Sequence, residues 1–169
     1  IPEKYEVFAE NKPQSDEYPD VLFASKFIEN GGVFHLCGNS KELVTKITEF
    51  FHDKKLNTVF CNNDDLGELL QVCGLSVFDK TLLNVPYDYM VMPIDFLIAE
   101  NGGIILSTKS SKIENIFNKT KHLILIALTS QVKQTSKDAL KSLLKNNTNT
   151  FPSQTMVLPD PSFQKKINI

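Results

Sequence analysis

The most constraining feature of this sequence is a succession of short apolar runs separated by amphipathic stretches of helical period. Residues 33–37, 58–61 and 122–128 are nearly continuous in apolar side chains and lack the polar alternation of a half-exposed strand. Such runs are typical of strands that are buried on both faces. The sequence therefore predicts an α/β fold, with a mostly parallel sheet and helices on both of its faces.

Capping residues and helix breakers delimit the helices expected between these runs. Pro19 suits a first helical turn and Gly31-Gly32 a left-handed stop, which predicts a helix over 19–30. Asn39, with Glu42 three residues later, predicts a helix over 40–53. Further helices are expected from residue 64 to Gly74 and from Thr135 to residue 145, because each has a polar cap before an apolar stripe.

The first eighteen residues differ in character from the rest of the chain. They are polar, contain two prolines and show no sustained period, which predicts an extended arm over 1–18 followed by a single domain over 19–169. The chain starts at Ile1 and not at Met, and its start lacks a signal segment that is basic and then apolar. We therefore expect that it was trimmed or belongs to a longer chain.

The charge of the chain restricts its partners. Eighteen basic residues stand against twenty acidic ones, for a formal net charge of −2, which argues against nucleic acid and anionic membranes as partners. All eighteen are Lys, so an anionic ligand would have to be held by backbone N–H groups, hydroxyls, amides or Lys. No apolar run approaches the length of about 18 residues that a membrane span requires. The sequence does not specify an oligomeric state.

The cysteines and histidines show no pattern of a metal or disulfide site. Cys37, Cys61 and Cys73 are odd in number, form no CxxC pair and lie in apolar segments, as expected of reduced core thiols in a cytoplasmic protein. His35 and His122 lie in apolar strands without the spacing of a metal pair, so no metal site is expected.

Ligands of open parallel sheets bind outside the carboxyl ends of the strands, so the residues after each apolar run are the candidate site. Asn39 and Ser40 follow one run, and Thr129 and Ser130 follow another. Both pairs can also be explained as helix caps. Glu100, Asn101, Gly102 and Gly103 follow the run at 96–99, where the glycines permit close approach of a ligand.

Glu100 is the candidate catalytic residue of this segment. It places a carboxylate at the end of a buried strand, beside glycines whose backbone N–H groups could donate to a bound anion. The same residues are also explained by a tight turn, because Asn-Gly between two apolar runs is a strong signal for a β-hairpin. The two interpretations are compatible with one another.

The segment Ile98-Ala99-Glu100-Asn101-Gly102-Gly103, followed by apolar residues, resembles the lactate-utilisation (LUD) domain family, in particular its C-component. The resemblance covers about residues 20–158, since the order of flanking elements is also similar. A second family segment, Gly-Pro-Ser-x-Thr-Ala-Asp-Ile, is matched at Pro152, Ser153 and Thr155. Phe151, Met156 and Val157 stand where that segment has Gly, Ala and Asp.

The resemblance implies a fold similar to that of sugar-phosphate isomerases and coenzyme A transferases. It also implies an accessory or small-ligand-binding subunit in the oxidation of L-lactate to pyruvate. The ligand would be a small anionic metabolite near Glu100, with Pro152, Ser153 and Thr155 as a second wall. Iron–sulfur clusters would be carried by partner oxidoreductase subunits, so this chain would bind no cofactor of its own.

Two other hypotheses remain open on the sequence. The chain could be an independent enzyme in which Glu100 attacks a coenzyme A thioester or acts on a phosphorylated metabolite, by analogy with the fold. Because the second segment has lost its aspartate, the chain could alternatively be a degenerate, non-catalytic scaffold domain.

Overall fold

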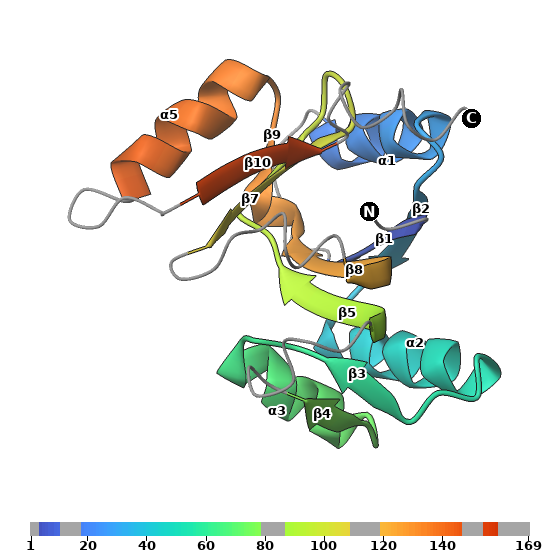
Figure 1. Cartoon of the computed structure of the whole chain (residues 1–169). Helices are drawn as coiled ribbons and strands as arrows, with labels where there is room; N and C mark the ends of the chain where they lie inside the picture. Colours follow the sequence, from blue (N-terminus) through green and yellow to red (C-terminus); the bar gives the residue numbers. More distant parts are fainter. Residues whose placement is uncertain (1–3, 11–17, 79–86, 109–118, 147–153, 159–169) are drawn as a thin grey trace, which may run out of the picture.

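The structure is a computed structural model that describes residues 4–10, 18–78, 87–108, 119–146 and 154–158 (Figure 1). The helices are α1 (Pro19–Glu29), α2 (Ser40–Asp53), α3 (Asp64–Val72), the short 3-10 helix η2 (Thr129–Gln131) and α5 (Ser136–Asn146). The strands are β1 (Lys4–Glu10), β2 (Val33–Cys37), β3 (Thr58–Phe60), β4 (Ser76–Phe78), β5 (Tyr87–Pro93), β6 (Phe96–Ile98), β7 (Gly103–Thr108), β8 (Thr120–Leu128), β9 (Val132–Lys133) and β10 (Gln154–Leu158).

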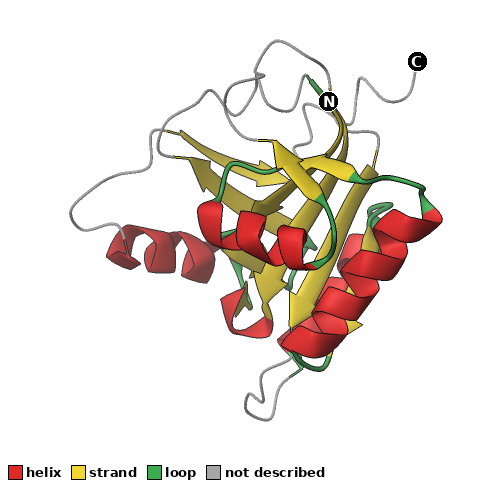
Figure 2. Cartoon of the chain, turned by 90° about the horizontal axis from the view of Figure 1, so that it is seen from below, coloured by secondary structure: helices red, strands yellow, loops and turns green. Residues whose placement is uncertain are grey.

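Six strands form the main sheet in the order β2-β1-β8-β5-β3-β4, and every neighbouring pair is parallel. This confirms the predicted α/β fold with a mostly parallel sheet. Helices cover both faces, as expected, with α2 and α3 on one and α1 on the other (Figure 2). On the α1 side, a second sheet of order β10-β7-β6-β9 completes the cover.

The prediction that residues 1–18 are an extended arm is wrong for residues 4–10. This segment is β1, an interior strand that pairs in parallel with β2 on one side and β8 on the other. Val7, Phe8 and Ala9 are almost completely buried. The segment looked like an arm because polar residues surround its short apolar stretch, whereas its pairing partners lie far along the chain. Residues 11–17 lie outside the described part.

The core has two large clusters, one on each face of the main sheet, because successive side chains of a strand point to opposite faces. On β1, Val7 belongs to the cluster under α1, and Phe8 to the cluster under α2 and α3. The small sheet is buried on both faces as well. Leu97 faces the α1 cluster, while Phe96 and Ile98 pack with residues of α5. Helix α5 is therefore an outer layer over the small sheet.

The helix boundaries follow the predicted caps closely. The Asn39 side chain accepts a hydrogen bond from the Glu42 N–H (3.0 Å) at the start of α2, and Asn63 caps α3 in the same way through Leu66. One detail differs from a capping box: the Glu42 carboxylate accepts from the N–H of Gly38 (2.7 Å) and not from that of Asn39. Ser111 and Glu114 have the spacing of a capping box, which predicts a short helical turn, but they lie outside the described residues.

Candidate functional site

The main sheet brings two of the predicted segments to one edge. Because its strands are all parallel, their carboxyl ends lie together, so Asn39 and Ser40 after β2 share this edge with Thr129 and Ser130 after β8. Asn39 is engaged as the cap of α2, Thr129 is buried, and Ser40 and Ser130 are exposed. The edge therefore offers hydroxyls and helix N-termini to a small ligand.

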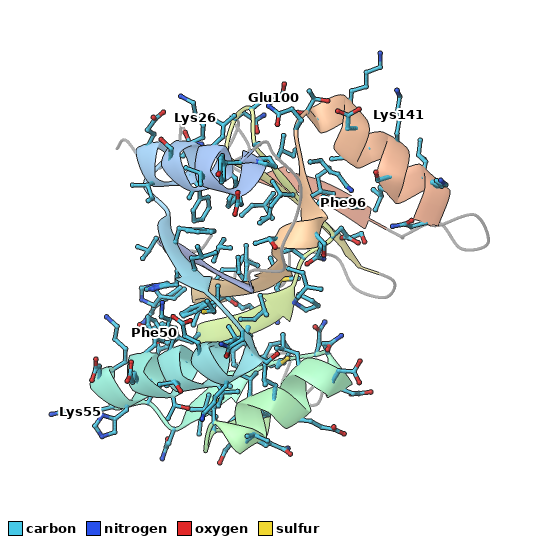
Figure 3. All side chains as sticks on the ribbon, turned by 180° about the vertical axis from the view of Figure 1, so that it is seen from behind. Lys26, Phe50, Lys55, Phe96, Glu100 and Lys141 are labelled. Carbon is cyan, nitrogen blue, oxygen red and sulfur yellow. The ribbon has the colours of Figure 1, made fainter. Side chains whose placement is uncertain are left out.

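Glu100 lies elsewhere, at the hairpin turn between β6 and β7 of the small sheet, and Figure 3 shows it where this turn meets α1 and α5. Its Oε1 accepts hydrogen bonds from both the N–H and the hydroxyl of Ser136, each at 2.7 Å. These two bonds hold the pKa of the exposed Glu100 carboxyl below its usual value. Glu100 thus caps the first turn of α5, where a negative charge is favourable.

The rest of the turn packs against helix α1. Asn101 accepts a bond from the Gly103 N–H through Oδ1 (2.8 Å), and its carbonyl accepts one from the Asn30 amide (2.8 Å). Gly102 has φ +69°, and a Cβ placed there would lie 2.6 Å from the backbone nitrogen of Phe27. The absence of a side chain at Gly102 therefore admits the backbone of α1, and the predicted hairpin is present.

The structure describes the second predicted segment only from Gln154 on, where it forms β10. Pro152 and Ser153 lie outside the described residues. Thr155 lies in β10, opposite Ser107 of β7, four register positions from the Gly103 end of that strand. This pairing places the Thr155 backbone toward the other end of the small sheet from the Glu100 turn.

Asp95 is a residue that the sequence reasoning missed, and it lies at that other end. It follows the carboxyl end of β5 and precedes β6, and its N–H donates to the Ile105 carbonyl (3.0 Å). Burial raises the pKa of the Asp95 carboxyl, while hydrogen bonds from the hydroxyl and N–H of Ser107 act in the opposite direction. The available signal was an acid two residues after an apolar strand, which resembles an ordinary turn residue.

The Gln131 side chain connects the segment between β5 and β6, which contains Asp95, to the end of β8. Its amide nitrogen donates to the carbonyls of Ile94 (2.7 Å) and Asp95 (3.2 Å), and its side-chain oxygen accepts from the Leu128 N–H (2.6 Å). Gln131 therefore connects the backbone at Asp95 to the end of β8, which Thr129 and Ser130 follow in the sequence. The Asp95 carboxyl itself is half-buried and receives its hydrogen bonds from Ser107.

The described residues contain no group of three or more His, Cys, Asp or Glu side chains that could hold a metal ion. In the same part of the chain, no helix is both long enough and apolar enough to cross a membrane. Comparison with protein-family models, curated proteins and solved structures gives no match to this chain. The class that the fold itself defines is an α/β protein with a parallel six-stranded sheet.

Proposed function

We propose that this chain is an accessory, small-ligand-binding subunit of lactate utilisation and does not use Glu100 as a nucleophile. The resemblance of residues 98–106 to the lactate-utilisation family supports the pathway. The single observation that carries the non-catalytic role of Glu100 is its double hydrogen bond with Ser136.

A carboxylate nucleophile must be able to move onto the reacting carbon of its substrate. At Glu100, one oxygen receives two donors from Ser136, and both bonds would weaken if the carboxylate moved away from α5. Gly102 does not open toward a ligand either, because the α1 backbone fills the space where its side chain would lie. The geometry therefore favours a structural role for Glu100 over attack on a coenzyme A thioester.

The ligand site is proposed at the carboxyl edge of the main sheet, around Asp95, Thr129 and Ser130. Hydroxyls and backbone N–H groups are among the donors that a chain without Arg can offer to a small carboxylate such as lactate or pyruvate. Asp95 is included because its half-buried carboxyl follows the carboxyl end of β5, a strand of the same main sheet.

Calorimetric titration of the purified chain with L-lactate, pyruvate, coenzyme A and ribose 5-phosphate tests the site. We expect a small carboxylate to bind, Ser130→Ala and Asp95→Asn to weaken it, and Glu100→Gln to leave its affinity unchanged. Ser25→Ala is a matched control, because Ser25 is an exposed serine of α1. Turnover of a thioester or phosphorylated compound that is abolished by Glu100→Gln would restore the enzyme hypothesis.

The proposed association with iron–sulfur oxidoreductase subunits is tested by affinity purification of the chain from cells of the source organism grown on lactate. Mass spectrometry and iron analysis of the eluate are expected to find iron–sulfur oxidoreductase subunits bound to the chain. Recovery of the chain alone, without iron, contradicts the accessory role. If the chain also binds none of the four ligands, the degenerate scaffold becomes the better hypothesis.

A further inference from the structure

Helix α5 carries an unusual outer surface. Its inner residues Ala139 and Leu143 pack on the small sheet, yet Leu140 and Leu144 remain 45% and 56% exposed. Positions four apart lie on one side of a helix, so these two leucines form a short apolar stripe. The two leucines thus add apolar area to the outer side of a helix whose inner side is already buried.

The charges beside this stripe are of one sign. Lys137, Lys141 and Lys145 are exposed and recur every four residues next to the leucines, and Figure 3 shows Lys141 pointing away from the molecule. None of the three forms an ion pair with another described residue. We call the three lysines with Leu140 and Leu144 the basic face of α5.

Helix α3 has the complementary character. Among the described α-helices it is the one without a basic residue, and it exposes Asp64, Asp65 and Glu68. Val72, one turn after Glu68, is 75% exposed and adds an apolar end. The three carboxylates form no ion pair with any described residue. We call these four residues the acidic face of α3.

We infer that copies of this chain associate head to tail, with the basic face of α5 in one copy against the acidic face of α3 in the next. The complementary charges and the exposed leucines and valine select this occupant. Exposed apolar residues of α1 do not compete, since the charges of α1 are of mixed sign. This inference is independent of the proposed function.

The placement of the two helices determines the form of the assembly. Helix α5 is the outer layer over the small sheet, and α3 covers the opposite face of the main sheet, so they lie at opposite ends of the molecule (Figure 1). A contact between different surfaces that point apart does not close on itself in a pair. The copies therefore form open-ended chains or rings of more than two copies. Two short helix faces make a small interface, so the association is weak and sensitive to salt.

Sedimentation velocity of the wild-type protein tests this inference. At low salt and protein concentrations up to about 0.5 mM, the weight-average mass is expected to rise from 19.1 kDa and to pass twice that value. At about 0.5 M salt the chain is expected to be monomeric. A plateau at the mass of a dimer, or a monomer under all conditions, overturns the inference.

Charge reversal identifies the surfaces. Lys141→Glu is expected to weaken the association about tenfold, and Glu68→Lys to do the same. The variant that carries both substitutions is expected to recover much of the lost association, because opposite charges face one another again. The matched control is Lys41→Glu, at an exposed lysine of α2.

An equal effect of Lys41→Glu, or no recovery in the doubly substituted chain, overturns the pairing of α5 with α3. If the wild type stays monomeric but floats with phosphatidylglycerol vesicles, and Lys141→Glu abolishes this, the basic face binds an anionic lipid surface instead. Circular dichroism melting of every variant shows that the comparison is made between folded chains.

Discussion

The two ends of strand β6 carry the same kind of contact in different surroundings. At one end the Asp95 carboxyl accepts hydrogen bonds from the hydroxyl and N–H of Ser107, and at the other Glu100 accepts the same pair from Ser136. The pKa of Asp95 is nevertheless raised, and that of Glu100 is lowered. The donors are alike, so the difference comes from solvent.

Burial explains the opposite directions. Asp95 is half-buried, and loss of water penalises its charged form more than the two bonds favour it. Glu100 is exposed, so its charge keeps its hydration and gains the bonds from Ser136. Similar donors therefore lower the pKa of an exposed carboxyl at the start of a helix, while burial raises the pKa of the carboxyl at the other end of β6.

The largest loss of stability is expected from Gly102→Ala, in the turn between β6 and β7 that contains Glu100. Its Cβ would lie 2.6 Å and 2.7 Å from backbone atoms of Phe27 and Lys26, so the turn or α1 must shift. We expect a loss of about 3 kcal/mol or more in the free energy of unfolding, measured by urea denaturation.

Gly31→Ala is the matched control for this substitution. Gly31 also has positive φ (+87°), but a Cβ added there would meet nothing within 4 Å. Its cost is therefore limited to backbone strain, about 1 kcal/mol. Equal losses for the two variants would show that the close approach of α1 to the turn contributes nothing.

Gln131→Ala removes the side chain that connects the segment between β5 and β6 to the end of β8. This substitution leaves the Leu128 N–H and the Ile94 carbonyl without their side-chain partner in a half-buried setting. We expect a loss of about 2 kcal/mol by urea denaturation. Gln134→Ala, at an exposed glutamine, is the control and is expected to be neutral within experimental error. Similar stability of both variants would mean that Gln131 does not lock the link between β5 and β6.

The raised pKa of Asp95 predicts how the stability of the wild type and that of Asp95→Asn differ with pH. Because the folded pKa of Asp95 is raised above 3.8, its contribution to stability is complete below 3.8 and is lost as the pH rises through the folded pKa. The wild type should therefore gain stability relative to Asp95→Asn on acidification. Urea denaturation of both proteins between neutral pH and about pH 3 measures this. A constant difference across that range contradicts the raised pKa.

Glu100→Gln should show the smallest effect and the opposite sign. The folded pKa of Glu100 is lowered below 4.5, so its contribution is present above 4.5 and is lost as the pH falls through the folded pKa. The deficit of Glu100→Gln relative to the wild type should therefore shrink on acidification, in the same titration. Ser136→Ala removes one of the two donors to Glu100 and should reduce this pH dependence. If the pH dependence of stability does not change in Ser136→Ala, the hydroxyl of Ser136 does not lower the pKa of Glu100.

Local signals predicted the secondary structure well. Asn39 and Asn63 mark the starts of α2 and α3, and Gly31 and Gly74 stand just beyond the ends of α1 and α3 with positive φ. The hairpin at Asn101 was also foreseen, because residues within one turn determine its conformation. Strand β1 was missed, since its identity depends on partners at β2 and β8 and not on its own pattern.

The sequence by itself determined the α/β class, the helix caps and the tight turn at Asn101, since each depends on residues only a few positions apart. Only the tertiary structure decided that residues 4–10 lie inside the sheet, that Glu100 caps a helix 36 residues away, and that Asp95 is held beside the end of β8. Hydrogen bonds and desolvation between distant segments arise only when the chain has packed, and they determine which carboxyl group is structural and which has its pKa raised.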